Sequence, residues 1–118
     1  MLVLAAGLLA ACGGSSGAEV NDPDAIRMKQ NAFSTSERSI PRGGTVTFVN
    51  EARGAPHILV IGLDGGQRRE PGAPSFGGAA GHRSNAGDAW TTPPFNATGT
   101  FHITCTVHPD MNLTVAVT

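Results

Sequence analysis

The stretch that decides the fold is GTFHITCTVHPDMNLTVAV, residues 99–117 near the C-terminus. Apolar and polar or β-branched residues alternate in its two halves with a period of two, which is typical of half-buried β-strands. We expect strands over 99–105 and 113–117, and the second would place Leu113, Val115 and Val117 on one face. The loop between them brings a cysteine, a histidine and a methionine close together.

The preceding sequence has the same character. No stretch of 11 or more residues after Pro23 shows the i, i+3, i+4 apolar spacing of an amphipathic helix, and short β-like runs are separated by Gly, Pro and Asn. This pattern predicts an all-β, antiparallel sandwich. Residues 58–61 are apolar on both faces, so their strand should be central. The further strands we expect are 25–29, 45–50 and 57–63, with weaker ones near Phe33, Ser39 and Trp90.

Length and charge exclude several classes of protein. The 118 residues suit one domain, which excludes a two-domain enzyme. Eight Lys and Arg against nine Asp and Glu give a net charge of -1, so we expect no nucleic-acid partner.

The N-terminus predicts an export signal. Residues 2–11, LVLAAGLLAA, are apolar but too short to span a bilayer. The run ends in Leu-Ala-Ala before Cys12, which resembles the bacterial lipobox and implies that Cys12 is lipidated. The alternatives are an ordinary cleavage site or a buried apolar segment, and no basic residue precedes the run. We expect a signal peptide at 1–11, a lipidated tether at 12–22 and a domain at 23–118, held at the outer face of the cell membrane or facing the periplasm.

Residues 64–89 form a long connection with seven glycines and two prolines. Such a length predicts a functional insertion or a mobile flap, and its arginines could dock an acidic partner. A solvated, variable loop is the interpretation we favour.

A metal site is predicted from the loop Cys105-Thr106-Val107-His108-Pro109-Asp110-Met111. Soft sulfur ligands select copper and other thiophilic ions, and two histidines, one cysteine and a weak axial methionine make a blue-copper site. His57 supplies the second histidine, 48 residues before Cys105. The alternatives are a buried free cysteine, a surface histidine and a core methionine. His102 is out of phase with Cys105 and should face solvent, and His82 lies in the 64–89 loop, so neither is expected to bind metal.

These residues together resemble the small cupredoxins. The resemblance rests on GGTVTFVN at 43–50, Pro56-His57, and Gly99-Thr100-Phe101 leading to Cys105-x2-His108-Pro109-x-Met111, and the short His-to-Met gap is closest to amicyanin. It implies a Greek-key β-sandwich with one type 1 copper held by His57, Cys105, His108 and Met111, in a non-enzymatic carrier of single electrons. It also implies transient redox-protein partners and a monomer.

Two residues depart from the family pattern. Ile58 stands where many members have an Asn that ties its strand to the cysteine loop, and Leu113 stands where a glycine is expected. The first departure removes a side-chain brace, so the redox potential is not predicted. Two other functions stay open, namely a copper carrier or sensor without a redox role and an inactive structural module.

Overall fold

The computed structural model describes residues 19–54 and 56–118. Strands account for all its regular structure apart from one short 3-10 helix, η1 (Gly78–Ala80). In the part of the chain described, no helix is long and apolar enough to cross a membrane. The strands are β1 (Ile26–Met28), β2 (Glu37–Ile40), β3 (Thr47–Asn50), β4 (His57–Leu63), β5 (Gly66–Gln67), β6 (His82–Ser84), β7 (Ala89–Thr91), β8 (Gly99–Cys105) and β9 (Asn112–Val117).

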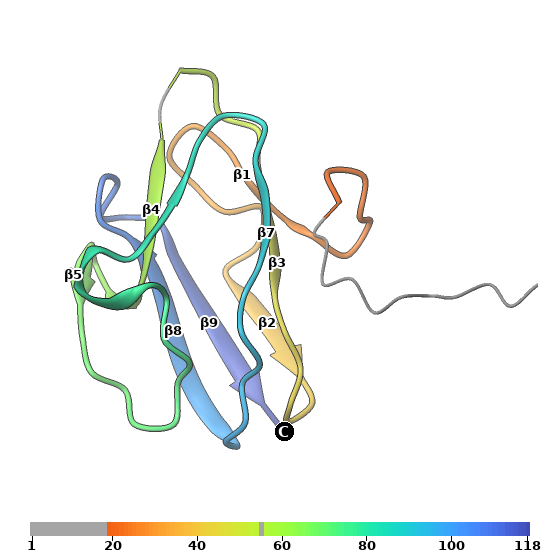
Figure 1. Cartoon of the computed structure of the whole chain (residues 1–118), viewed down its shortest axis with the longest axis vertical. Coiled ribbons are helices and arrows are strands. Elements are labelled where there is room, and N and C mark those ends of the chain that lie inside the picture. The colour runs from red at the N-terminus through yellow and green to blue at the C-terminus, as the bar shows by residue number, and fades with distance from the viewer. Residues whose placement is uncertain (1–18, 55) are drawn as a thin grey trace, which may run out of the picture.

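Two sheets make up the sandwich (Figure 1). The smaller has the order β1-β3-β7, and the larger has the order β2-β9-β8-β4-β5, with β6 also paired to β4. The chain passes between the sheets after β1, β2, β3, β6 and β7, so neighbours in sequence are often not neighbours in a sheet. The predicted all-β Greek-key sandwich is confirmed.

The apolar alternation read from the sequence places the core between the sheets. In β9 the side chains of Leu113, Val115 and Val117 are buried, and the residues between them are half-buried. β4 lies inside the larger sheet with Leu59 and Val60 both buried, as expected for a strand that is apolar on both faces. The weaker strands near Ser39 and Trp90 are β2 and β7, whereas Phe33 makes only an isolated bridge to Met28.

The connection between β4 and β7 differs from the solvated loop that we favoured. It contains two short strands, β5 and β6, which pair with β4, and it buries Phe76 at 3% exposure against Trp90. Most of its other side chains are exposed. Glycine-rich sequence carries no apolar periodicity, which is why these short strands give no sequence signal.

Candidate metal centre

The predicted donors meet at one end of the larger sheet. His57 is the first residue of β4 and Cys105 the last residue of β8. These strands are antiparallel neighbours, with Leu59 opposite Cys105, so the start of one strand lies beside the end of the other. His108 follows in the loop, and Met111 comes directly before β9.

Three of these residues offer donor atoms at a spacing that suits a metal ion. The Sγ of Cys105 lies 3.6 Å from Nδ1 of His57 and 3.8 Å from Nδ1 of His108, and all three atoms lie within 4.8 Å of one another. Donors bound at about 2.0–2.3 Å to one ion are separated by roughly 3.3–4 Å. The three atoms are therefore placed to share one ion after a small adjustment.

Met111 belongs to the same loop and is buried at 1% exposure. Its backbone N–H donates to the carbonyl of His108 over 2.9 Å, which closes the loop into a tight turn. Its thioether would complete the predicted set of four.

The surroundings of His57 prepare it to bind through Nδ1. The ring is fully buried, and its Nε2 lies 2.9 Å from the carbonyl oxygen of Lys29. A carbonyl can only accept, so Nε2 carries the proton and Nδ1 keeps its lone pair. Burial lowers the pKa of His57, the Lys29 hydrogen bond partly opposes this, and neighbouring His108 lowers it further. The neutral ring is the form that binds a metal.

The structure shows what Ile58 and Leu113, the two departures from the family pattern, do in this fold. Ile58 has no polar side chain, but its carbonyl accepts a 2.9 Å bond from the N–H of Thr106 directly after Cys105. A backbone bond therefore joins the His57 strand to the cysteine loop. Leu113 is fully buried in β9, paired with Ile103 of β8, so this position belongs to the core.

The other histidines lie elsewhere. His82 stacks on Trp90 with ring centroids 3.7 Å apart. His102 is half-buried, with Nδ1 2.8 Å from the Glu70 carboxylate, rather than facing only solvent as predicted. Cys12 lies outside the described residues, and Cys105 is a free cysteine.

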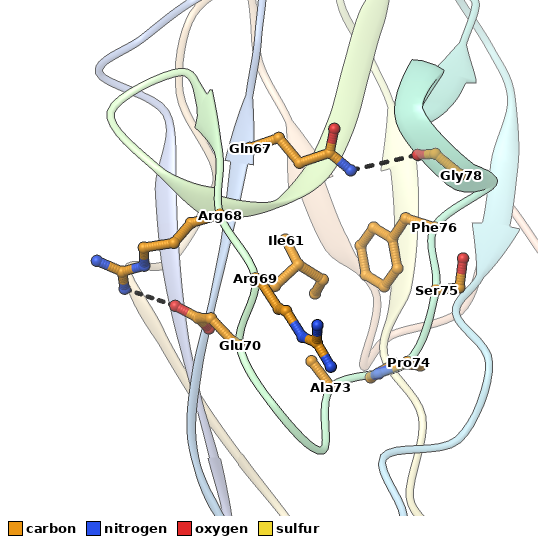
Figure 2. A pocket seen from close by; sticks show the side chains of 10 residues that line it. All are labelled: Ile61, Gln67, Arg68, Arg69, Glu70, Ala73, Pro74, Ser75, Phe76 and Gly78. Atoms are coloured by element: carbon orange, nitrogen blue, oxygen red, sulfur yellow. Dashed lines mark hydrogen bonds and ion pairs between the residues drawn. The ribbon is translucent and has the colours of Figure 1, made fainter.

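A separate small cavity of about 180 Å³ lies between Ile61 and Phe76, and Figure 2 shows the side chains that line it. Arg68, Arg69 and Glu70 stand on its rim, and none of its lining residues is a histidine or cysteine. It is smaller than most ligand pockets, which run to about 300–1,000 Å³. The cavity is therefore distinct from the metal centre.

Sequence reasoning missed the groups that support the donors. These include the carbonyl of Lys29, the hydroxyl of Thr104 and the side chain of Asn112. The turn Asp64-Gly65 joins β4 to β5 and touches the ligand loop at Pro109. An Asp-Gly pair is a strong hairpin signal, so this turn could have been predicted from the sequence.

The chain is similar to solved structures, whereas two other comparisons found no match. No family model matches the chain, and no curated protein does. An oxidised proline-to-glycine variant of amicyanin is 24% identical with a TM-score of 0.60, covering 87% of this chain and 90% of its own. A purple cupredoxin from Nitrosopumilus maritimus is 21% identical with a TM-score of 0.56, covering 79% and 99%. The chain therefore has the cupredoxin fold, in an amicyanin-like form.

The donor set fits copper and does not fit metal ions that prefer oxygen ligands. A thiolate with two imidazoles, beside a buried thioether, is a soft set that suits copper, whereas calcium and magnesium require oxygen ligands. These are the ligand types of a type 1 copper site, as the sequence predicted.

Proposed function

We propose that this protein carries single electrons on one type 1 copper ion. The observation that carries the proposal is the convergence of His57, Cys105 and His108 within 4.8 Å at one end of a cupredoxin sandwich. Copper bound there supplies one-electron chemistry by alternating between Cu(I) and Cu(II). The amicyanin structures of the same fold include oxidised and reduced Cu(I) forms.

The protein's contribution is to hold the donors still. His57 and Cys105 are fully buried on neighbouring strands, so they keep one geometry in both oxidation states. Only His108 is half-exposed, with exposed Val107 and Pro109 beside it. We propose that its ring edge is the point of electron entry and exit, where a redox protein docks weakly and briefly.

Burial favours this role over a copper carrier or sensor. A protein that hands over its metal needs donors that an acceptor can reach, and here two of the three are closed off. The proposed function includes no enzymatic reaction, and the chain is proposed to act as a monomer.

Spectroscopy of the purified full-length protein loaded with Cu(II) tests the proposal. We expect an intense blue colour, because a thiolate bound to Cu(II) gives a strong charge-transfer band, and we expect Cys105→Ser to be colourless. One electron per copper should bleach the colour reversibly. A tightly bound but colourless copper complex of the wild type would overturn the type 1 site. A blue protein that loses its copper on reduction would support the carrier instead.

We also propose an exported location with a lipid on Cys12, which rests on the sequence alone. Cell fractionation of the wild type and of Cys12→Ser tests it. The wild type should sediment with membranes and the variant should be released. If both stay with the membrane and mass spectrometry finds no lipid, the anchor is excluded.

A further inference from the structure

We propose that Thr104, acting with the Asp64-Gly65 turn, is a positioning residue that fixes the Met111 end of the loop between β8 and β9. The inference rests on the proposed copper function, because it assigns a role within that centre. It adds a connection at the Met111 end of the loop to the one that the Ile58 carbonyl makes at the cysteine end.

Thr104 lies directly before Cys105, yet its hydroxyl binds Met111 at the other end of the loop. The side chain is fully buried, and Oγ1 donates to the carbonyl of Met111 over 2.9 Å. The same oxygen accepts the N–H of Gly65 over 2.9 Å. One buried hydroxyl thus connects the turn after β4 to the residue that carries the thioether.

The turn approaches the loop closely because of its glycine. Gly65 has φ +81°, and a Cβ on it would lie 3.1 Å from Cα, Cβ and Cγ of Pro109. A side chain here would force the turn and the ligand loop apart. The contact with Pro109, the residue after His108, therefore depends on glycine at position 65.

Asn112 makes a second connection on the outer side. Its Oδ1 accepts the N–H of Asp64 over 2.9 Å, and its Nδ2 donates to Oδ1 of Asp64 over 3.1 Å and to the carbonyl of Pro109 over 3.4 Å. Asp64 is the one non-glycine residue of the described chain with positive φ, at 52°. Asp tolerates this conformation well, so the turn is suited to present its N–H groups to the loop.

These contacts act on the donor geometry as well as on stability. The Met111 carbonyl accepts from both the Thr104 hydroxyl and the Cys105 N–H, the latter over 3.2 Å. Fixing that carbonyl fixes the peptide plane and hence the Cα from which the thioether extends. The cysteine side of the loop is tied by the Ile58 carbonyl, and the methionine side is tied by Thr104. Supporting hydrogen bonds of this kind tune a metal's affinity and potential.

The test compares Thr104→Val, Thr104→Ser and Thr92→Val in the full-length protein. Valine keeps the shape of threonine but removes the hydroxyl, and serine restores it. Thr92 is a matched control, because it is buried at 3% exposure and its hydroxyl accepts the Val46 N–H over 3.1 Å, away from the donors. In copper-free protein, we expect amide exchange at Gly65 to accelerate about tenfold in Thr104→Val only.

In copper-loaded protein, we expect Thr104→Val to remain blue with a changed absorption band ratio and a raised reduction potential, because a looser thioether favours Cu(I). Thr104→Ser should return both to the wild-type values, and Thr92→Val should not move them. If Thr104→Val does not fold, Gly65→Ala disrupts the same contact from the side of the turn. It should change the absorption band ratio and the reduction potential in the same way.

Wild-type spectra and potential in both Thr104→Val and Gly65→Ala would overturn the positioning role. An equal change in Thr92→Val would also overturn it, because the effect would then be general destabilisation. The proposed copper function fails separately, when the wild type itself is colourless. The exchange rate of Gly65 in copper-free protein would still show whether the brace exists.

Discussion

The loop between β8 and β9 and the connection between β4 and β7 achieve order by different means. The first, from Thr106 to Met111, is short and is held by hydrogen bonds to backbone groups and to Thr104. The second runs over residues 64–88. It is held by the buried ring of Phe76, by strands β5 and β6, and by the contacts of the Glu70 carboxylate with His102. Short loops are fixed by their closure, whereas long ones need separate anchors. The comparison implies that the first region places His108 and Met111, whereas the second, beyond its Asp64-Gly65 turn, contributes mainly stability.

The largest effect on stability is expected at Phe76, the buried ring of the connection between β4 and β7. It packs edge-on against Trp90 with centroids 5.0 Å apart. We expect Phe76→Ala to lower the free energy of unfolding by about 3–5 kcal/mol, because it removes a large core side chain. Urea denaturation of copper-free protein measures this. Half-buried Phe33→Ala should cost less, and a change below about 1 kcal/mol for Phe76→Ala would refute the anchor.

The second anchor of the long connection is the carboxylate of Glu70. Its Oε1 accepts the backbone N–H of His102 over 2.6 Å, and Oε2 lies 2.5 Å from Arg68 and 2.8 Å from the His102 ring. Burial raises the pKa of Glu70, but the hydrogen bonds from Arg68 and His102 together outweigh it, so the net pKa is lowered. A lowered carboxylate pKa means that the folded protein binds protons less readily than the unfolded chain.

We therefore expect Glu70→Gln to lower the free energy of unfolding by about 1–2 kcal/mol at pH 7. This stabilisation is present above the unfolded pKa of about 4.3 and is lost as the pH falls through the lower folded pKa. Denaturation curves of wild type and variant at several pH values should converge in that range. Exposed Glu37→Gln is the control, and a pH-independent difference would show that the charge of Glu70 is not what stabilises the connection.

Met111→Leu tests the loop between β8 and β9, where we expect a change in reduction potential rather than in stability. The substitution conserves volume, so the free energy of unfolding of copper-free protein should change by less than about 1.5 kcal/mol. The reduction potential should rise, because the weak axial donor is lost. Voltammetry measures the potential, with Met28→Leu in the core as the matched control. An unchanged potential in Met111→Leu would show that the thioether is not a ligand.

The smallest effect is expected at Ser84, which pairs with His57 across β6 and β4. Its Oγ is the one buried side-chain oxygen or nitrogen in the described chain without a partner. Ser84→Ala should therefore change the free energy of unfolding by no more than about 0.5 kcal/mol, since no hydrogen bond is lost. A loss above 1 kcal/mol in thermal or urea denaturation would mean that a bound water or the copper centre uses this hydroxyl.

The two regions were also unequal in what could be predicted. His57, Cys105 and His108 were found because residue type and spacing reveal a soft donor set. The strands β4 and β8 were predicted to the residue, because their apolar patterns are strong. β5 and β6 were missed because glycine-rich sequence has no periodicity and these strands form by pairing with β4. The contact of His102 with Glu70 joins residues 32 positions apart, which no local pattern encodes.

The sequence by itself determined the sandwich, its core faces and the identity of the proposed copper ligands, because alternation and ligand chemistry are local properties. Only the tertiary structure decided how those ligands are supported. The Lys29 carbonyl selects the Nδ1 donor of His57, the Ile58 carbonyl replaces an absent side chain, and Thr104 connects Gly65 to Met111. These partners are distant in sequence and meet only when the strands pair, so their contacts depend on register and turn geometry rather than on any motif.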